Sequence, residues 1–244
     1  PKGKFRLSRR TTENLLENLT RLTDDERATL GLAECNDGAY MPVIVDVDLK
    51  VERDLLSDDT DWESSNILYS QLDVETIIEI YQDVLSDIVE NCTDEHLICV
   101  LLEKDWYAST RGSTTYIKNG FHLHFPFLFL KRTSQSVHLI DRVKMRLGET
   151  TLFQNLGVDD AGDVIDKATL KNPWLMYGCS KGGDSTNAYR VSAIYDHAGD
   201  EVGFEVFDKY PLFDMDNRAI RVGNYGEKYL PRILSITTLI VMFV

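Results

Sequence analysis

Apolar positions recur with two different periods along this chain, and the two periods predict helices and strands in alternation. Helical spacing predicts helices over residues 11–31, 73–92 and 134–147. Apolar or alternating runs predict strands over residues 42–48, 96–103, 120–130, 174–180, 189–196 and 203–208. Strands separated by helices, with further strands late in the chain, indicate an α+β fold or an α/β sandwich.

Two carboxylates interrupt the first of these strands. Asp46 and Asp48 lie in the apolar run "PVIVDVDLK", and the alternation of a strand puts both on one face, opposite Val45 and Val47. Like charges side by side on a half-buried surface repel, and a bound cation would remove that repulsion. The alternative is that the strand ends here and that water solvates both acids.

A pair of histidines marks a second strand, in the stretch "NGFHLHFP". Alternation puts His122 and His124 on one face and Phe121, Leu123 and Phe125 on the other. A strand of this kind suits the floor of a site, although a buried histidine is also a common structural residue.

Composition narrows the class of protein. The 244 residues are 43% hydrophobic and 27% charged, which is typical of an ordinary globular protein. The four cysteines form no CxxC pair, so neither a disulfide framework nor a zinc knuckle is indicated. The chain starts at Pro1 and ends in the apolar tail 233–244, which is too short to cross a bilayer as a helix. We therefore expect a piece of a longer chain, with no membrane as a partner.

Charge is distributed unevenly. The net charge of −14 argues against nucleic-acid binding by the chain as a whole. Residues 104–146, however, contain eight basic and only two acidic residues. A local basic surface of this kind can hold phosphates whatever the total charge is.

The acidic pair, the histidine strand and a later aspartate resemble the three motifs of the archaeo-eukaryotic primase superfamily. "VDVDLK" is similar to the acidic motif through Asp46 and Asp48, and "GFH" to the small-x-His motif through Gly120 and His122. "VID" is similar to the hydrophobic-Asp motif through Asp166, whereas His124 lies outside all three.

A longer block makes the resemblance more specific. The run "IDKATLKNPWLMYGCSKG", followed by Tyr189 and Arg190, resembles the primase part of primase-helicases from large DNA viruses of the poxvirus, asfarvirus and mimivirus kind. Cys179 is a small departure from that pattern. The resemblance divides the chain into a basic arm and helical extension (1–34), a primase catalytic domain (35–235) and an apolar tail (236–244) that leads into a further region.

The resemblance implies an RRM-like antiparallel sheet flanked by helices, and DNA-directed nucleotidyl transfer. Asp46, Asp48 and Asp166 would ligate two Mg²⁺ or Mn²⁺ ions, which prefer carboxylate oxygens. The residues expected to hold the phosphates of an NTP or dNTP are His122, Lys181, Ser180 and Lys50. For Lys50, an ordinary solvated side chain is an equal alternative. The implied partners are a single-stranded DNA template and a helicase, in the same chain or separate, at the site of viral replication.

Four basic residues flank the histidine strand and are expected to contact the template backbone: Arg111, Lys118, Lys131 and Arg132. The stretch 106–115 around Arg111 is consistent with a mobile loop over template or nucleotide, or with an idle connection between strands. Each of the four could instead be part of a solvated rim.

Two other functions compete with the primase interpretation. A His-hydrophobic-His motif also ligates metal in HUH-type nicking endonucleases, for which Tyr225 and Lys228 have a suitable spacing, but that function leaves Asp46, Asp48 and Asp166 unexplained. A non-catalytic single-strand-binding module would not need the three acids. "GCSKGGDS" lacks the residue order of a phosphate-binding loop, so no ATPase motif is evident.

Overall fold

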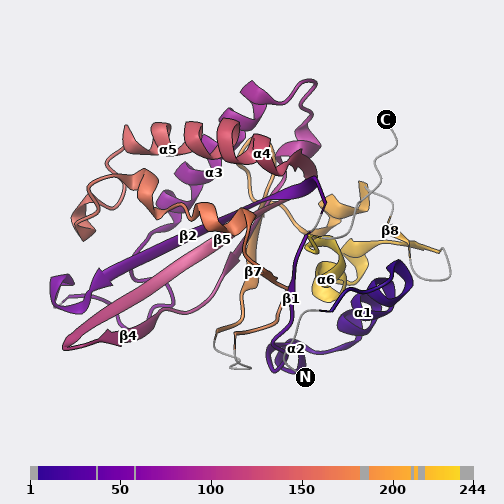
Figure 1. The fold of residues 1–244 in the computed structure, drawn as a ribbon, viewed down its shortest axis with the longest axis horizontal. Helices are drawn as coiled ribbons and strands as arrows, with labels where there is room; N and C mark the ends of the chain where they lie inside the picture. Colours follow the sequence, from indigo (N-terminus) through magenta and orange to yellow (C-terminus); the bar gives the residue numbers. More distant parts are fainter. Residues whose placement is uncertain are drawn as a thin grey trace.

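An antiparallel sheet runs through the middle of the molecule (Figure 1). The structure is a computed structural model that describes residues 5–36, 38–57, 59–181, 187–209, 212–213 and 218–236. Neighbouring strands follow the order β2-β5-β3-β7, and β4 pairs with the first part of β5. These strands are β2 (Tyr40–Glu52), β3 (Cys99–Glu103), β4 (Tyr107–Arg111), β5 (Thr114–Lys131) and β7 (Arg190–Tyr195).

Shorter elements surround this sheet. Two-stranded ladders join β1 (Ala33–Glu34) to β6 (Trp174–Leu175) and β8 (Leu212–Phe213) to β9 (Ala219–Ile220). The α-helices are α1 (Arg9–Arg21), α2 (Asp24–Ala28), α3 (Gln71–Ile88), α4 (Arg132–Ser134), α5 (Asp141–Gly148) and α6 (Leu230–Ile233). A π-helical turn, η3 (Gln135–Ile140), joins α4 to α5. The 3₁₀ turns are η1 (Arg53–Leu55), η2 (Asp94–Leu97), η4 (Gln154–Leu156), η5 (Ala161–Val164), η6 (Lys167–Leu170), η8 (Phe204–Lys209), η9 (Val222–Asn224) and η10 (Gly226–Tyr229).

One face of the sheet is covered by α3 and α5, which lie along it in Figure 1. Helix α3 begins at a capping box in which Ser70 and Asp73 exchange hydrogen bonds, and this satisfies backbone donors of the first turn. Its apolar stripe packs in one cluster with Phe121, Leu123 and Phe125 of β5, and the ring centroids of Tyr81 and Phe125 are 6.2 Å apart. Asp46 and Asp48 of β2 and His122 and His124 of β5 alternate with core residues of this cluster and therefore face the other way.

The opposite face is covered by the C-terminal part of the chain. Val100, Leu102 and Ile194 of the sheet pack with residues of η8 and α6 in a second apolar cluster. Helix α1 lies beyond it and buries Leu16 and Leu19 against Met176 and Cys179. The described part of the expected N-terminal extension thus packs on the segment that follows β6.

The antiparallel α+β fold expected from the sequence is confirmed. Three local predictions were wrong. Residues 203–208 form most of η8 rather than a strand, and of the strand predicted over 174–180 only β6 is formed. The stretch 106–115 forms a β4–β5 hairpin, and is neither the mobile loop nor the idle connection between strands that the sequence suggested. The helix predicted over 11–31 is divided, because Thr23 and Glu26 form a capping box that starts α2.

No helix in the part of the chain that the structure describes is long and apolar enough to cross a membrane. Most of the apolar tail lies outside the described residues, and so do Pro1–Lys4.

Candidate functional site

The three sequence motifs meet in one row across strand β2. Asp46 lies opposite His122 of β5, and the His122 Nε2 atom is 3.4 Å from the Asp46 Oδ1 atom. On the other edge of β2, Val47 pairs with Ile165, and the Asp166 backbone N–H donates to the Asp46 carbonyl at 3.0 Å. This register puts Asp166 directly opposite Asp46, with both side chains on one face. Asp46 is therefore flanked by His122 and Asp166.

The second acid of the pair lies beside a glycine. Asp48 is opposite Gly120, and its Oδ2 atom is 3.4 Å from the Lys118 ammonium. A Cβ atom on Gly120 would lie only 2.2 Å from the Val47 carbonyl oxygen, which is closer than real Cβ atoms approach. The small residue of the GFH motif is thus required by the close approach of β2 and β5.

The positions of the three carboxylates suit hard divalent cations, but their side chains are engaged with protein donors. Asp46 contacts His122, Asp48 contacts Lys118, and the Asp166 Oδ1 atom accepts a hydrogen bond from the Ala168 N–H at 2.8 Å. Among the described residues, no three His, Cys, Asp or Glu side chains already form a group that could hold a metal ion. Ligation by all three would need side-chain rotation, and the metal site stays a prediction.

Charge and burial determine the protonation states of Asp46 and His122. Burial alone would raise the pKa of Asp46, but His122, Lys104 and Lys118 together hold it below its ordinary value. Burial lowers the pKa of His122 more than the Asp46 carboxylate raises it. At neutral pH, Asp46 is therefore an ionised carboxylate and His122 is a neutral imidazole.

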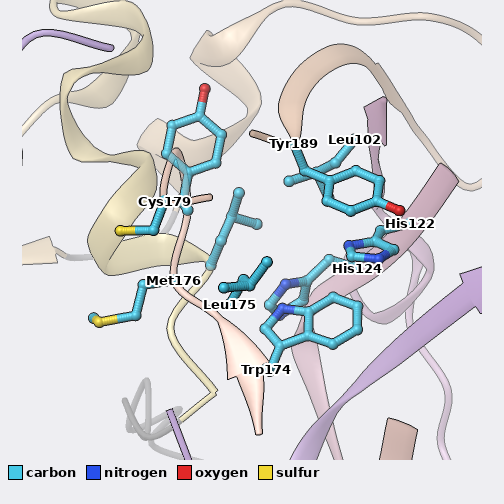
Figure 2. Close-up of a pocket in the computed structure, with 10 residues that line it drawn as sticks. Leu102, His122, His124, Trp174, Leu175, Met176, Cys179 and Tyr189 are labelled. Carbon is cyan, nitrogen blue, oxygen red and sulfur yellow. The ribbon is translucent and has the colours of Figure 1, made fainter. Parts of the chain in front are cut away.

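Two aromatic rings enclose His122, as Figure 2 shows. The Tyr189 ring stacks on the imidazole with centroids 3.5 Å apart, and the Trp174 ring lies 4.2 Å away on the other side. The cavity that these three residues line with Leu102 and His124 measures about 10 Å³, enough for one water but not for a nucleotide. A nucleotide would therefore lie outside this cavity.

His124 is more deeply buried than His122. Its side chain is 1% exposed, and neither ring nitrogen has a hydrogen-bond partner among the described residues. Burial, together with the neighbouring His122, lowers the pKa of His124 to about 3. The ring therefore stays neutral and behaves as a core residue.

The other expected phosphate ligands differ in placement. Lys181 is exposed, and its positive charge contributes to lowering the pKa of Lys104. Lys50 is also exposed, and its ammonium lies 3.7 Å from the centroid of the Tyr116 ring. Ser180 is fully buried and donates its hydroxyl to the Ala28 carbonyl at 2.7 Å, so this geometry gives it a structural role instead of the expected contact with a nucleotide.

The four expected template residues do not form one patch. Arg111 ends β4 beside the turn at Gly112, whereas Lys131 ends β5 and Arg132 follows it. Lys118 and Lys131 are separated by roughly 40 Å of extended strand at about 3.3 Å per residue. Arg132 donates to the Asn36 carbonyl, and Lys131 lies over the Tyr40 ring at 5.9 Å.

Part of the basic segment is neutralised within the protein. On α5, Arg146 pairs with Asp83 and Asp87 of α3 at 3.5 and 2.6 Å, and Lys144 pairs with Asp163 at 3.6 Å. These ion pairs lie on the side of the sheet covered by α3 and α5, so the two basic residues do not add positive charge to the surface around His122.

Sequence reasoning did not identify three residues that complete the site. Trp174 and Tyr189 enclose His122, and Lys104 lies with its ammonium 4.4 Å from the Tyr189 ring centroid. Burial raises the pKa of Tyr189, and the carboxylates of Asp46 and Asp48 raise it further. The tyrosine followed by a basic residue was noted in the sequence, but no spacing indicated that its ring would cover the histidine.

Comparison with known proteins gives this arrangement a context. Residues 1–195 match the family described as "C962R protein N-terminal AEP domain", where AEP denotes the archaeo-eukaryotic primase type. The match covers well over half of the chain.

Curated viral proteins are similar over most of the chain. "Putative helicase 121R" of Invertebrate iridescent virus 3 is 34% identical over 246 residues, which cover 97% of this chain and 25% of the relative. "Putative helicase 184R" of Invertebrate iridescent virus 6 is 33% identical over 219 residues, covering 85% of this chain and 22% of the relative. The chain thus spans about a quarter of the length of these relatives.

Proposed function

Because this chain belongs to the family of archaeo-eukaryotic primase domains, we propose that it is a DNA-directed nucleotidyltransferase that makes or extends primers on single-stranded DNA. The observation that carries the proposal is the row in which Asp46 lies between His122 and Asp166, with Asp48 on the same face. The printed names of the viral relatives support a helicase as the partner, in the same longer protein or separate.

The carboxylates Asp46, Asp48 and Asp166 would hold Mg²⁺ or Mn²⁺. When bound, such cations supply Lewis-acid polarisation of the α-phosphate and charge stabilisation of the leaving pyrophosphate. Lys181, Lys50 and His122 would bind the triphosphate of an NTP or dNTP. The strand face that carries these residues would present the nucleotide to the template.

Primer synthesis is the direct test of this function. The protein is incubated with a single-stranded template, labelled nucleotides and Mg²⁺ or Mn²⁺, with and without an annealed primer. New products without a primer indicate a primase, and products only with a primer indicate a polymerase; both support nucleotidyl transfer. A cleaved template indicates a nicking endonuclease, and template binding without any product indicates a binding module; either result contradicts the proposal.

We expect the two histidines to separate the primase from the nicking alternative. Replacing His124 by Leu should leave synthesis unchanged, because the ring has no hydrogen-bond partner among the described residues and lies in apolar surroundings. Replacing His122 by Ala should abolish synthesis. Initial rates of primer extension check both variants, and thermal melting confirms that each is folded. Equal loss in both variants would favour a metal site built from the two histidines.

Template binding is expected to depend on charge at both ends of β5. Two double variants test this, Arg111→Gln with Lys118→Gln and Lys131→Gln with Arg132→Gln. For each phosphate contact that is lost, the slope of log K against log salt should become shallower by about 0.7. Fluorescence anisotropy with labelled single strands at several salt concentrations measures the slope. Wild-type slopes in both double variants would show that the template runs elsewhere.

A further inference from the structure

Lys104 follows directly after β3, at the end of the sheet where Gly120 lies opposite Asp48. Glu103 pairs with Phe121 on one side and with Arg190 on the other. The same register puts Lys104 beside Gly120 and Tyr189, and Gly120 is in turn opposite Asp48. Because Gly120 has no side chain, it places no side chain between the lysine and Asp48.

The ammonium of Lys104 is held by aromatic rings. It lies 4.4 Å from the centroid of the half-buried Tyr189 ring and 5.3 Å from that of the exposed Tyr107 ring. No carboxylate in the described ranges forms an ion pair with it within 4.0 Å, although the charges of Asp46 and Asp48 act on it from farther away. Its three N–H donors are thus oriented without an ion-pair partner among these residues.

The charges around Lys104 favour an anionic ligand. Burial lowers its pKa, the carboxylates of Asp46 and Asp48 oppose that shift, and the like charges of Lys118 and Lys181 add to it. The three lysines repel one another, and the carboxylates of Asp46, Asp48 and Asp166 offset that repulsion when no metal is bound. Divalent cations on the carboxylates would increase that repulsion, and a triphosphate would relieve it.

We propose that Lys104 binds a phosphate of the incoming nucleoside triphosphate, and that the Tyr189 ring positions its ammonium for this contact. The inference rests on the proposed function, because it assigns a ligand residue within that same site. Lys104 is then a substrate-binding residue, and Tyr189 is a positioning residue that links the lysine to His122 through the stacked rings.

The decisive probe is inorganic tripolyphosphate, which carries the phosphates of a nucleotide without its base or sugar. Binding of tripolyphosphate and of a non-hydrolysable nucleoside triphosphate is measured by calorimetry, with Mg²⁺ present, for the whole chain. We expect Lys104→Met to weaken both by about 10- to 100-fold, as for a lost charge-assisted hydrogen bond, and Lys104→Arg to restore part of the affinity. In primer extension the loss should appear as a raised KM for the nucleotide.

Variants of Tyr189 and a matched lysine provide the controls. Tyr189→Phe keeps the ring and should bind like the wild type, whereas Tyr189→Leu should weaken binding by about 2- to 30-fold. Lys228 also lies over two tyrosine rings, at 5.1 and 5.3 Å, and Lys228→Met should change neither ligand's affinity.

Two results would overturn the inference. Wild-type affinity for tripolyphosphate in a folded Lys104→Met variant would show that Lys104 only balances charge. Equal weakening by Tyr189→Phe and Tyr189→Leu would remove the positioning role of the ring. Failure of the proposed function is distinguishable, because the wild type would then bind tripolyphosphate through Lys104 but incorporate no nucleotide.

Discussion

Replacing Asp46 by Asn is expected to reduce template-directed nucleotide incorporation by roughly a thousandfold or more. A divalent cation contributes several kcal/mol to charge stabilisation in a transition state, and each ~1.4 kcal/mol is a factor of about ten in rate. Asp46 is central to the row with His122 and Asp166, so its loss would affect metal binding directly. Single-turnover primer extension in Mg²⁺ and in Mn²⁺ measures the effect.

The fold should tolerate this change. Asn keeps the shape of the side chain, and the lost attraction to His122 is offset by relief of repulsion from Asp48 and Asp166. Asp163→Asn is a suitable control, since that side chain is 79% exposed and lies outside the row. Near-wild-type activity in a folded Asp46→Asn variant would refute the assignment of this carboxylate as a metal ligand.

Replacing Gly120 by Ala is expected to destabilise the protein by about 1–3 kcal/mol and to reduce synthesis as well. The added Cβ would lie 2.2 Å from the Val47 carbonyl oxygen and 3.3 Å from the Asp48 Cα atom. All of its nearest neighbours are backbone atoms, so β2 and β5 must separate at the point where the acids face His122. Urea denaturation gives the free energy of unfolding, and primer extension gives the activity.

Gly31→Ala is the matched control for this prediction. A Cβ atom at Gly31 would lie 3.8 Å from the Ser180 carbonyl oxygen, which is an ordinary contact distance. We expect its free energy of unfolding to stay within about 1 kcal/mol of the wild-type value. If Gly120→Ala were as stable and as active as Gly31→Ala, the close approach of the two strands would not constrain the site.

The sequence predicts which side chains share a face of a single strand, and this accounts for the placement of the acids on β2 and of the apolar residues on β5. The spacing of Asp46 and Asp48 predicted a shared face, and β2 has them there. The apolar face of β5 was likewise predicted from Phe121, Leu123 and Phe125, which pack in the core with α3.

Pairing between strands could not be predicted in the same way. The contact of Lys104 with Tyr189 depends on the registers of β3 with β5 and with β7, which are set by tertiary packing and include a shift between Leu101 and Leu102. The hydroxyl of Ser180 appeared available for a ligand because the sequence does not show that Ala28 would lie against it. The period of residues 203–208 suited a strand, but Val206 and Phe207 are buried from a 3₁₀ turn instead.

The central claim is nucleotidyl transfer, and the stoichiometry of pyrophosphate release tests it most directly. The wild-type chain is given a single-stranded template of defined sequence, an annealed primer, one labelled nucleotide at a time, and Mg²⁺ or Mn²⁺. We predict one pyrophosphate for each nucleotide incorporated, incorporation only of the nucleotide complementary to the template, and no incorporation with chelator or in Asp46→Asn. Template cleavage with a DNA–tyrosine adduct and no pyrophosphate, or template binding without any incorporation, would contradict this account.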